Sequence, residues 1–262
     1  MDTRLRTIIL NQVKEHFPRN KNGRTRTDAE LILTQIQHVL WTGAPWRSLA
    51  TNVSFQTIHR HFMSWARCGV FKKAYETAIK LMRRPGRRRE YHCIDTTFIK
   101  NIYGMDCKGR NPTDRGRSAT KLSAIVDGTG LPISIAFFPG NIHDVRTVSI
   151  TLDKRVLRHK ERIPLYADKA YYSQKVFADM NRSGYIPRVT KRKEVTHRVV
   201  NRKRNVVERT FSWLDKSRRL ILRYDATIVA YESFTWLACM RLVSDMRNCF
   251  FATQTSEYAK KF

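Results

Sequence analysis

Two apolar runs on either side of a glycine-rich turn constrain the fold of this chain more than any other feature. The segment "TKLSAIVDGTGLPISIAFFPG" contains two stretches rich in β-branched and aromatic residues, near Lys121–Val126 and Pro132–Phe138. Asp-Gly-Thr-Gly, residues 127–130, lies between them. Such a turn between two apolar runs is a strong signal for a β-hairpin. The chain is therefore expected to contain an antiparallel sheet.

The segments around this hairpin predict a mixed sheet with helices. Upstream, "YHCIDTTFIKNIY" (Tyr91–Tyr103) alternates as a strand does. Downstream, the pattern predicts a helix from Asp144 to about Arg158, a strand in "IPLYADKAYY", a helix from Ser173 to Ser183, a strand in "GYIPRVT", and helices around Arg202–Leu220 and Tyr231–Phe250. The order β-β-β-α-β-α-β-α, with the first three strands as an antiparallel meander, is that of a ribonuclease-H-like α/β domain.

The N-terminal part, residues 1–82, is expected to form a small all-α domain. Apolar residues recur at helix spacing from Leu31 to Leu40, Thr27 or Asp28 can cap that helix, and residues 43–45 interrupt it. Ser54 can cap a further helix. This is the pattern of a helix-turn-helix, which predicts that Gln56, Thr57 and Arg60 face a DNA groove. A plain helical bundle with a solvated basic face is the alternative.

A basic segment, "RRPGRRRE", follows at residues 83–90. Arginines around a Pro-Gly turn are typical of an exposed linker, and Arg87, Arg88 and Arg89 are predicted to contact DNA phosphates. The domain boundary is placed here, so residues 91–262 form the expected catalytic domain.

The charge of the chain indicates its partner. A formal net charge of +28 implies a polyanion, because many Lys and Arg side chains displace counterions from phosphates. Acidic lipid is the competing polyanion, but no basic amphipathic anchor and no membrane-length apolar run is present, so double-stranded DNA is favoured. Five scattered cysteines without a CxxC pair argue against disulfides and zinc fingers and favour a reducing compartment. The default expectation is a cytoplasmic chain bound to the chromosome.

Three acids stand out against this basic background. Asp95 lies within the first expected strand, Asp168 ends the fourth, and Glu208 lies on the penultimate helix among seven Lys and Arg in residues 201–220. Each has an ordinary explanation: a core aspartate for Asp95, a cap for Asp168, and an ion pair with Arg204 for Glu208. If the first and fourth strands are neighbours, however, the three acids can converge. Convergent carboxylates repel one another unless cations lie between them, and two Mg²⁺ ions suit phosphodiester chemistry.

Four blocks of sequence carry a resemblance to a known family. They are "IDTTFIK" (Ile94–Lys100), "SATKLSAIVDGTGLPISIAFFPGNIHD" (Ser118–Asp144), "LYADKAYYS" (Leu165–Ser173) and "RNVVERTFSWL" (Arg204–Leu214). With "GAPWRSLA" and "HRHFMSWARCGVF" before them, they resemble the bacterial DDE transposases of insertion sequences, most closely the IS5-like group of the IS4/IS5 superfamily. The likeness covers nearly the whole chain from about Thr27, and the four blocks occur in the family's order.

The resemblance implies roles for particular residues. Asp95, Asp168 and Glu208 match the family's catalytic, metal-binding triad, which holds two Mg²⁺ ions and accepts Mn²⁺. The family's pattern around the glutamate is Tyr-x2-Arg-x3-Glu-x6-Lys. This chain keeps Arg204 but has Asn201 and Asp215 at the outer positions. The residues then expected to bind DNA are Arg204, Lys216, Arg218 and, on the Glu208 face of a continued helix, Arg219.

Three other residues have two interpretations each. Trp213 could stack on an extruded base or belong to the core. Asp127 is most simply the hairpin turn residue. Asp144 is more often a helix cap than a metal ligand, although the His-Asp pair recurs in the resembling family.

The functional expectation is a transposase that binds terminal inverted repeats, cleaves at the 3′ ends and joins them to target DNA. It would act as a homodimer or higher oligomer on DNA, since two ends must be brought together. Two alternatives remain: a Mg²⁺-dependent nuclease without strand transfer, and a DNA-binding repressor or domesticated relative without catalysis.

Overall fold

The computed structural model describes residues 1–18, 27–82, 91–159, 161–191 and 198–259. Two compact units make up the chain: residues 84–232 form one, and residues 1–83 together with 233–262 form the other. We call the first the sheet unit and the second the helical unit, and describe each by itself. The expected basic linker at residues 83–90, with Arg87, Arg88 and Arg89, lies outside the described residues.

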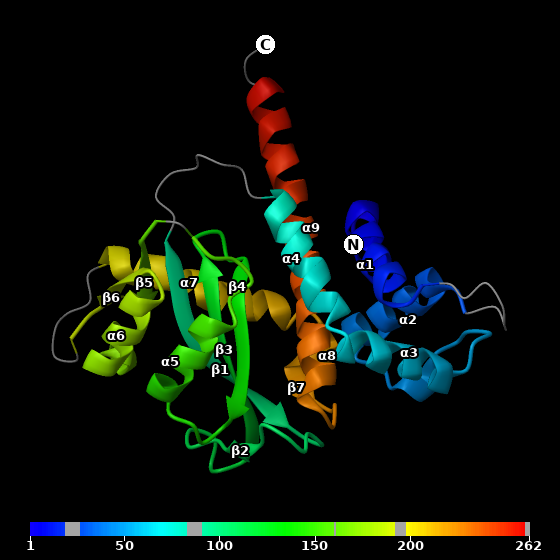
Figure 1. Cartoon of the computed structure of the whole chain (residues 1–262), viewed down its shortest axis with the longest axis horizontal. Helices are drawn as coiled ribbons and strands as arrows, with labels where there is room; N and C mark the ends of the chain where they lie inside the picture. The colour runs from blue at the N-terminus through cyan, green and yellow to red at the C-terminus, as the bar shows by residue number, and fades with distance from the viewer. Residues whose placement is uncertain (19–26, 83–90, 160, 192–197, 260–262) are drawn as a thin grey trace. The chain divides into compact units, whose positions relative to one another are not determined.

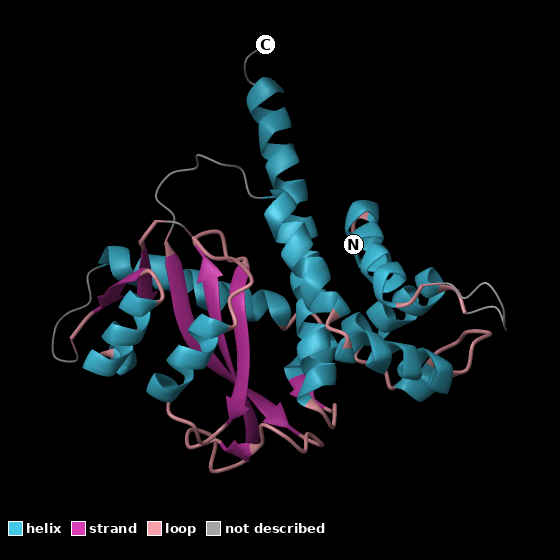
Figure 2. Ribbon diagram, viewed as in Figure 1, coloured by secondary structure: helices cyan, strands magenta, loops and turns pink. Residues whose placement is uncertain are grey.

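The sheet unit is built on a seven-stranded mixed sheet (Figure 2). Its main order is β4-β3-β1-β5-β6, with β2 beside β3 and β7 beside β1. The strands are β1 His92–Asn101, β2 Gly109–Arg110, β3 Ser118–Asp127, β4 Pro132–Pro139, β5 Ile163–Ala167, β6 Tyr185–Val189 and β7 Leu222–Arg223. The first three long strands pair antiparallel, and β5 and β6 are parallel to β1. This confirms the expected ribonuclease-H-like α/β arrangement.

The turn between β3 and β4 has the predicted hairpin chemistry. One carboxylate oxygen of Asp127 accepts hydrogen bonds from the backbone N–H groups of Thr129, Gly130 and Leu131 and from the Thr129 hydroxyl. Gly130 has a φ of 103°, which side-chain-bearing residues rarely adopt. Asp127 is therefore the turn residue, as expected.

Helices cover both faces of this sheet (Figure 1). Helices α5 (Asp144–Asp153) and α6 (Gln174–Arg182) lie on one face, and α7 (Arg198–Leu214) crosses the other. Several helix boundaries differ from the expectation. Helix α5 ends at Asp153, before the expected Arg158. His143, rather than Asp144, accepts the capping bond of α5, from the N–H of Val145. Helix α7 ends at Leu214, and a separate short helix, α8 (Arg218–Ile221), follows it.

The helical unit contains the expected helices of the N-terminal part and one more. Helix α2 (Ala29–Thr42) is capped by Asp28 and ends at Gly43, whose φ is 72°. The 3-10 turn η1 (Trp46–Ser48), α3 (Phe55–Arg67, capped by Ser54) and α4 (Val70–Met82) follow. The additional helix, α1 (Thr3–His16), buries Leu5, Ile9 and Val13, a period that charged neighbours obscure in the sequence.

The long C-terminal helix, α9 (Ile228–Ala259), supplies part of the helical unit's core. Phe234 stacks on Phe62 with ring centroids 4.4 Å apart, and Trp236 contacts Tyr75 at 5.1 Å. Residues from Ser233 onward therefore group with the N-terminal helices, whereas the sequence places them in the catalytic domain. None of the helices in the described part of the chain combines the length and the hydrophobicity that a membrane span needs.

Candidate active site

Asp95 and Asp168 lie on neighbouring parallel strands. β1 and β5 pair with His92 opposite Leu165 and Cys93 opposite Tyr166. Asp95 follows Cys93 by two residues, and Asp168 follows Tyr166 by two, directly after β5 ends. Continuing the register therefore sets the two aspartates side by side and on the same face of the sheet. The adjacency of the first and fourth long strands, on which the sequence argument depended, is present.

Helix α7 packs across these two strands. Val206 and Val207 form a buried cluster with Cys93 of β1 and Tyr166 of β5. The Cys93 thiol donates to the backbone carbonyl of Lys203 at 3.1 Å, which holds the helix against β1.

The far end of α7 is held at the hairpin turn. The hydroxyl of Thr210 is buried and donates to the carbonyl of Gly130 at 2.8 Å. Together with the Cys93 contact, this bond fixes the helix at two points, with Arg204 and Glu208 one turn apart between them.

Arg204 bridges the helix and the acids. Its Nη1 atom lies 3.1 Å from Oδ1 of Asp168. The sequence alternative paired Arg204 with Glu208; among the described residues, Arg204 forms its ion pair with Asp168. Glu208 is exposed on the same helix.

The electrostatics of Asp95 reflect both of the other acids. Partial burial raises the pKa of Asp95 from the ordinary 3.8 to about 6. The N–H of Thr96, 2.8 Å away, and the Arg204 guanidinium lower this pKa, while the charges of Asp168 and Glu208 raise it further. The metal-free site is thus a place where negative charge is costly and a cation is favoured.

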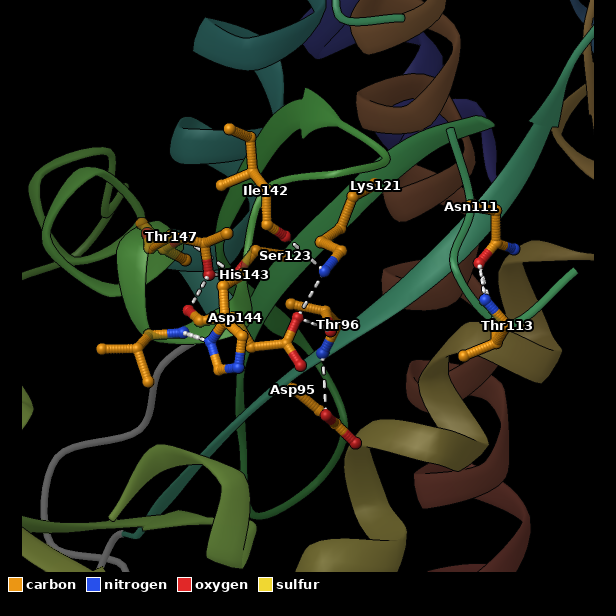
Figure 3. Close-up of polar contacts among 12 residues, drawn as sticks. Asp95, Thr96, Asn111, Thr113, Lys121, Ser123, Ile142, His143, Asp144 and Thr147 are labelled. Carbon is orange, nitrogen blue, oxygen red and sulfur yellow. Dashed lines mark hydrogen bonds and ion pairs between the residues drawn. The ribbon is translucent and has the colours of Figure 1, made fainter. Parts of the chain in front are cut away.

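A second carboxylate network lies beside Asp95 (Figure 3). Oδ1 of Asp144 accepts the Thr96 hydroxyl at 2.9 Å and the ammonium group of Lys121 at 2.6 Å. Asp144 is therefore not the cap that the sequence suggested, because its side chain points toward β1 and β3. The available signal was Lys121 within the apolar run "TKLSAIV", since a buried lysine requires a carboxylate partner.

Tyr171 of the 3-10 turn η2 (Lys169–Tyr171) completes the surroundings of the acids. Its hydroxyl is fully buried, and burial together with the nearby charges of Asp95, Asp144 and Asp168 raises its pKa well above the usual value. Tyr171 therefore remains protonated at any physiological pH.

The donor set of the three acids suits a hard divalent cation. Mg²⁺ and Mn²⁺ prefer carboxylate oxygens, and Asp95, Asp168 and Glu208 provide them. Within the described part of the chain, no three His, Cys, Asp or Glu side chains converge closely enough to hold a metal ion. The Arg204–Asp168 ion pair engages one oxygen of a carboxylate in this donor set.

The three basic residues after Leu214 that are expected to bind DNA differ in their exposure to solvent. Lys216 and Arg218 are exposed, but Arg219 is buried and both Nε and Nη2 donate to Asp225, at 3.2 and 2.8 Å. Because α7 ends at Leu214, Arg219 does not lie on the Glu208 face of that helix. The expected placement of Arg219 on the Glu208 face is therefore corrected: its guanidinium forms an internal ion pair with Asp225.

Trp213 packs on the hairpin turn rather than standing free. A Cβ atom at Gly130 would lie 2.9 Å from the Trp213 ring, and the guanidinium of Arg209 lies 4.8 Å from the ring centre on its face. Trp213 is half-buried by these contacts, which agree with the core interpretation.

The candidate DNA-reading residues of the helical unit lie on α3. Gln56 and Arg60 are exposed, and Thr57 is half-buried where its hydroxyl accepts from the Ser54 hydroxyl at 3.0 Å. Ile58 and Phe62, on the other face of this helix, are fully buried. The face carrying Gln56 and Arg60 is therefore the solvent-facing side of α3 within the helical unit.

Comparisons with known proteins identify the family. A profile of the transposase DDE domain matches residues 87–243, and a profile of IS4/5-family transposases matches residues 9–75. A transposase of insertion sequence element IS402 from Burkholderia cepacia is 31% identical over 144 residues, which make up 52% of this chain and 68% of that protein.

Two solved structures are more distant. The piggyBac transposase in a synaptic complex with hairpin DNA is 11% identical, with a TM-score of 0.49 over 92% of this chain and 71% of that one. The Mos1 transposase in a paired-end complex with a left transposon end is 13% identical, with a TM-score of 0.28 over 94% of this chain and 70% of that one. The two family profiles and the IS402 relative show the family. The chain belongs to the IS4/IS5 family of DDE transposases, which are enzymes that act on DNA.

Proposed function

We propose that this transposase binds the terminal inverted repeats of its insertion sequence, cleaves the 3′ ends and transfers them to target DNA. One observation carries the proposal. Asp95 and Asp168 lie on adjoining parallel strands, with Glu208 on the helix that crosses them and close enough to raise the pKa of Asp95. Within a DDE domain, three interacting carboxylates on these elements are the expected machinery for phosphodiester chemistry.

Asp95, Asp168 and Glu208 would hold the divalent metal, with two Mg²⁺ ions as the preferred occupants and Mn²⁺ as a substitute. When bound, the metal supplies charge neutralisation at the phosphate and activation of a water or 3′-hydroxyl. The protein's own part is positional: β1 and β5 hold the aspartates in register, and the contacts of α7 with Cys93 and Gly130 set the height of Glu208.

We propose two roles for Arg204. In the metal-free protein it neutralises Asp168. With a divalent metal held by Asp168, the Arg204 guanidinium would be available to contact a phosphate of the transposon strand, a role to which its planar donor geometry is suited.

The remaining DNA contacts are proposed from charge and exposure. The net charge of +28 supports a DNA backbone as the partner. Lys216 and Arg218 are exposed near the end of α7, and Gln56, Thr57 and Arg60 lie on α3 as candidates for reading the repeat. Two ends must be synapsed, so we also propose a dimer or higher oligomer on DNA, acting in the cytoplasm at the chromosome.

The test uses a labelled duplex carrying both ends of the DNA element that encodes the chain, with Mg²⁺. Wild type is compared with Glu208→Gln, and Glu161→Gln, an exposed glutamate of the same unit, is the matched control. Wild type and Glu161→Gln are expected to nick and join the ends, while Glu208→Gln binds without cutting.

The other outcomes separate the alternatives. Cleavage without joined product would identify a Mg²⁺-dependent nuclease. Binding by all three proteins without cleavage in Mg²⁺ or Mn²⁺ would identify a DNA-binding protein that has no catalysis.

A further inference from the structure

Thr96 connects the two faces of β1. Side chains alternate along a strand, and the Cys93 and Asp95 side chains belong to the face that α7 covers. Thr96 points to the other face, where it lies opposite Ser123 of β3. Its backbone N–H donates to Oδ1 of Asp95 at 2.8 Å, while its hydroxyl donates to Oδ1 of Asp144 at 2.9 Å (Figure 3). One residue thus holds a carboxylate on each side.

The Asp144 carboxylate that accepts the Thr96 hydroxyl is held in turn by the buried Lys121. The Lys121 side chain is only 5% exposed, and its ammonium group donates to Asp144 and to the carbonyl of Ile142, both at 2.6 Å. The same ammonium lies 4.7 Å from the centre of the Phe98 ring. A buried ammonium with this many partners has little freedom to move, because any displacement leaves a charge unpaired.

Helix α5 adds a second anchor on the same face. The Thr147 hydroxyl donates to the Asp144 carbonyl at 2.7 Å, and the Thr151 hydroxyl donates to the Ser123 hydroxyl at 2.9 Å. Asp144 is therefore fixed both at its carboxylate and at its backbone. The Asp95 carboxylate, by contrast, is oriented by the hydrogen bond from the Thr96 N–H.

We propose that Thr96 is a positioning residue, and that its hydroxyl bond to the Asp144–Lys121 pair fixes the peptide N–H that orients the Asp95 carboxylate. This inference rests on the proposed role of Asp95 in metal binding. In this proposal Asp144 acts through Thr96, because its Oδ1 atom accepts the Thr96 hydroxyl and also pairs with the Lys121 ammonium group. Removing a group that orients a metal-binding side chain through hydrogen bonds commonly weakens metal affinity by about 10- to 100-fold.

The discriminating variant is Thr96→Val, which removes the hydroxyl, keeps the branched shape and leaves the Asp144–Lys121 pair intact. Thr96→Ser restores the hydroxyl. Thr97→Val makes the same chemical change one residue along the strand, on the opposite face, and is the matched control. Asp144→Asn probes the same connection from its other end.

Two quantities are measured on the full-length protein: Mn²⁺ affinity in the absence of DNA, from the paramagnetic resonance signal of free Mn²⁺, and the Mg²⁺ concentration for half-maximal end cleavage. Thr96→Val and Asp144→Asn are expected to weaken Mn²⁺ binding and raise the required Mg²⁺ by about tenfold. Thr96→Ser and Thr97→Val should match wild type, and DNA binding in chelator should be equal for all.

The outcomes separate this inference from the proposed function. If Asp95→Asn abolishes Mn²⁺ binding but Thr96→Val binds as wild type does, only the positioning role is overturned. If Thr96→Val and Thr96→Ser lose affinity equally, the γ-hydroxyl is not responsible and the inference also fails. If wild type and Asp95→Asn bind Mn²⁺ identically, the proposed metal site and the inference fail together.

Discussion

Arg204 and Asp168 form an ion pair between helix α7 and the end of β5, with 3.1 Å between Nη1 and Oδ1. The pair occupies one of the three carboxylates proposed to bind metal, and Arg204 lies four residues before the third, Glu208. Arg204 and a divalent cation would therefore compete for Asp168, and DNA would favour the state in which the arginine has been released.

Removing the Arg204 guanidinium should strengthen Mn²⁺ binding and weaken DNA binding. An ion pair of this partly exposed kind is worth less than about 1 kcal/mol, so Arg204→Gln should tighten Mn²⁺ binding by about two- to fivefold. It should also weaken binding to transposon ends and reduce the slope of log affinity against log salt by about 0.9, the contribution of one phosphate contact. Titrations of Mn²⁺ and of DNA check both effects.

Arg202→Gln is the control for that experiment, because Arg202 is exposed on the same helix. It should leave Mn²⁺ affinity unchanged. Weaker Mn²⁺ binding by Arg204→Gln would show that Arg204 supports the metal site instead of competing with it.

Because the pKa of Asp95 is raised in the folded protein, the ionised Asp95 carboxylate is expected to lower the free energy of unfolding at neutral pH. Its pKa in the folded protein is about 6, against 3.8 ordinarily, so the folded state holds this proton more tightly than the unfolded chain does. The free energy of unfolding therefore falls as pH rises from about 4 to 6, and the full cost of about 3 kcal/mol remains above that range. Asp95→Asn should accordingly stabilise the metal-free protein at pH 7.5 and have little effect near pH 4.

Urea unfolding at the two pH values in a chelating buffer measures this difference. Asp153→Asn, at an exposed aspartate of α5, should show no comparable dependence on pH. An Asp95→Asn variant that is no more stable than wild type at pH 7.5 would contradict the assignment of the cost to this carboxylate.

The hairpin turn should tolerate no side chain at Gly130. An alanine there would need a φ of 103°, and its Cβ would lie 2.9 Å from the Trp213 ring and 3.0 Å from the Thr210 hydroxyl. Gly130→Ala should lower the free energy of unfolding by about 2 to 4 kcal/mol, from backbone strain and overpacking together. It should also change the fluorescence of the folded protein if Trp213 moves.

Gly184→Ala separates these two causes. Gly184 has a φ of 81°, but nothing lies within 4 Å of a Cβ built there. Its substitution should cost only the strain, about 1 kcal/mol. Equal losses at the two glycines would mean that the contact with Trp213 contributes nothing.

The two basic residues Lys216 and Arg219 should behave differently despite their closeness in sequence. Arg219→Gln leaves Asp225 as an unpaired buried carboxylate and should destabilise the protein by about 3 to 5 kcal/mol. Lys216→Gln, at an exposed site, should change stability by less than about 0.5 kcal/mol. It should instead reduce the salt dependence of DNA binding, which a filter-binding series at several salt concentrations would show. A stable Arg219→Gln protein with weakened DNA binding would restore the phosphate role expected from the sequence.

Local chemistry in the sequence was enough to predict most of the sheet unit. Asp127 and the two glycines after it specify a turn whose hydrogen bonds lie within four residues, so no distant part of the chain is needed to form it. Strand alternation is an equally local signal, and it locates β1, which carries Asp95, and β5, which ends just before Asp168. In the helical unit, the caps at Asp28 and Ser54 locate the starts of α2 and α3 in the same way.

The remaining features depend on contacts between residues far apart in the chain. The hairpin, the order of strands and helices and the family blocks could be predicted from the sequence, because they are encoded in neighbouring residues. The packed fold was needed to show that Arg204 pairs with Asp168, that the Asp144 side chain points toward Thr96 and Lys121, and that Arg219 is buried against Asp225. The partner of a buried charged side chain depends on which elements pack beside it, and these elements can lie far apart in the sequence. Local sequence patterns therefore do not predict the ion pair.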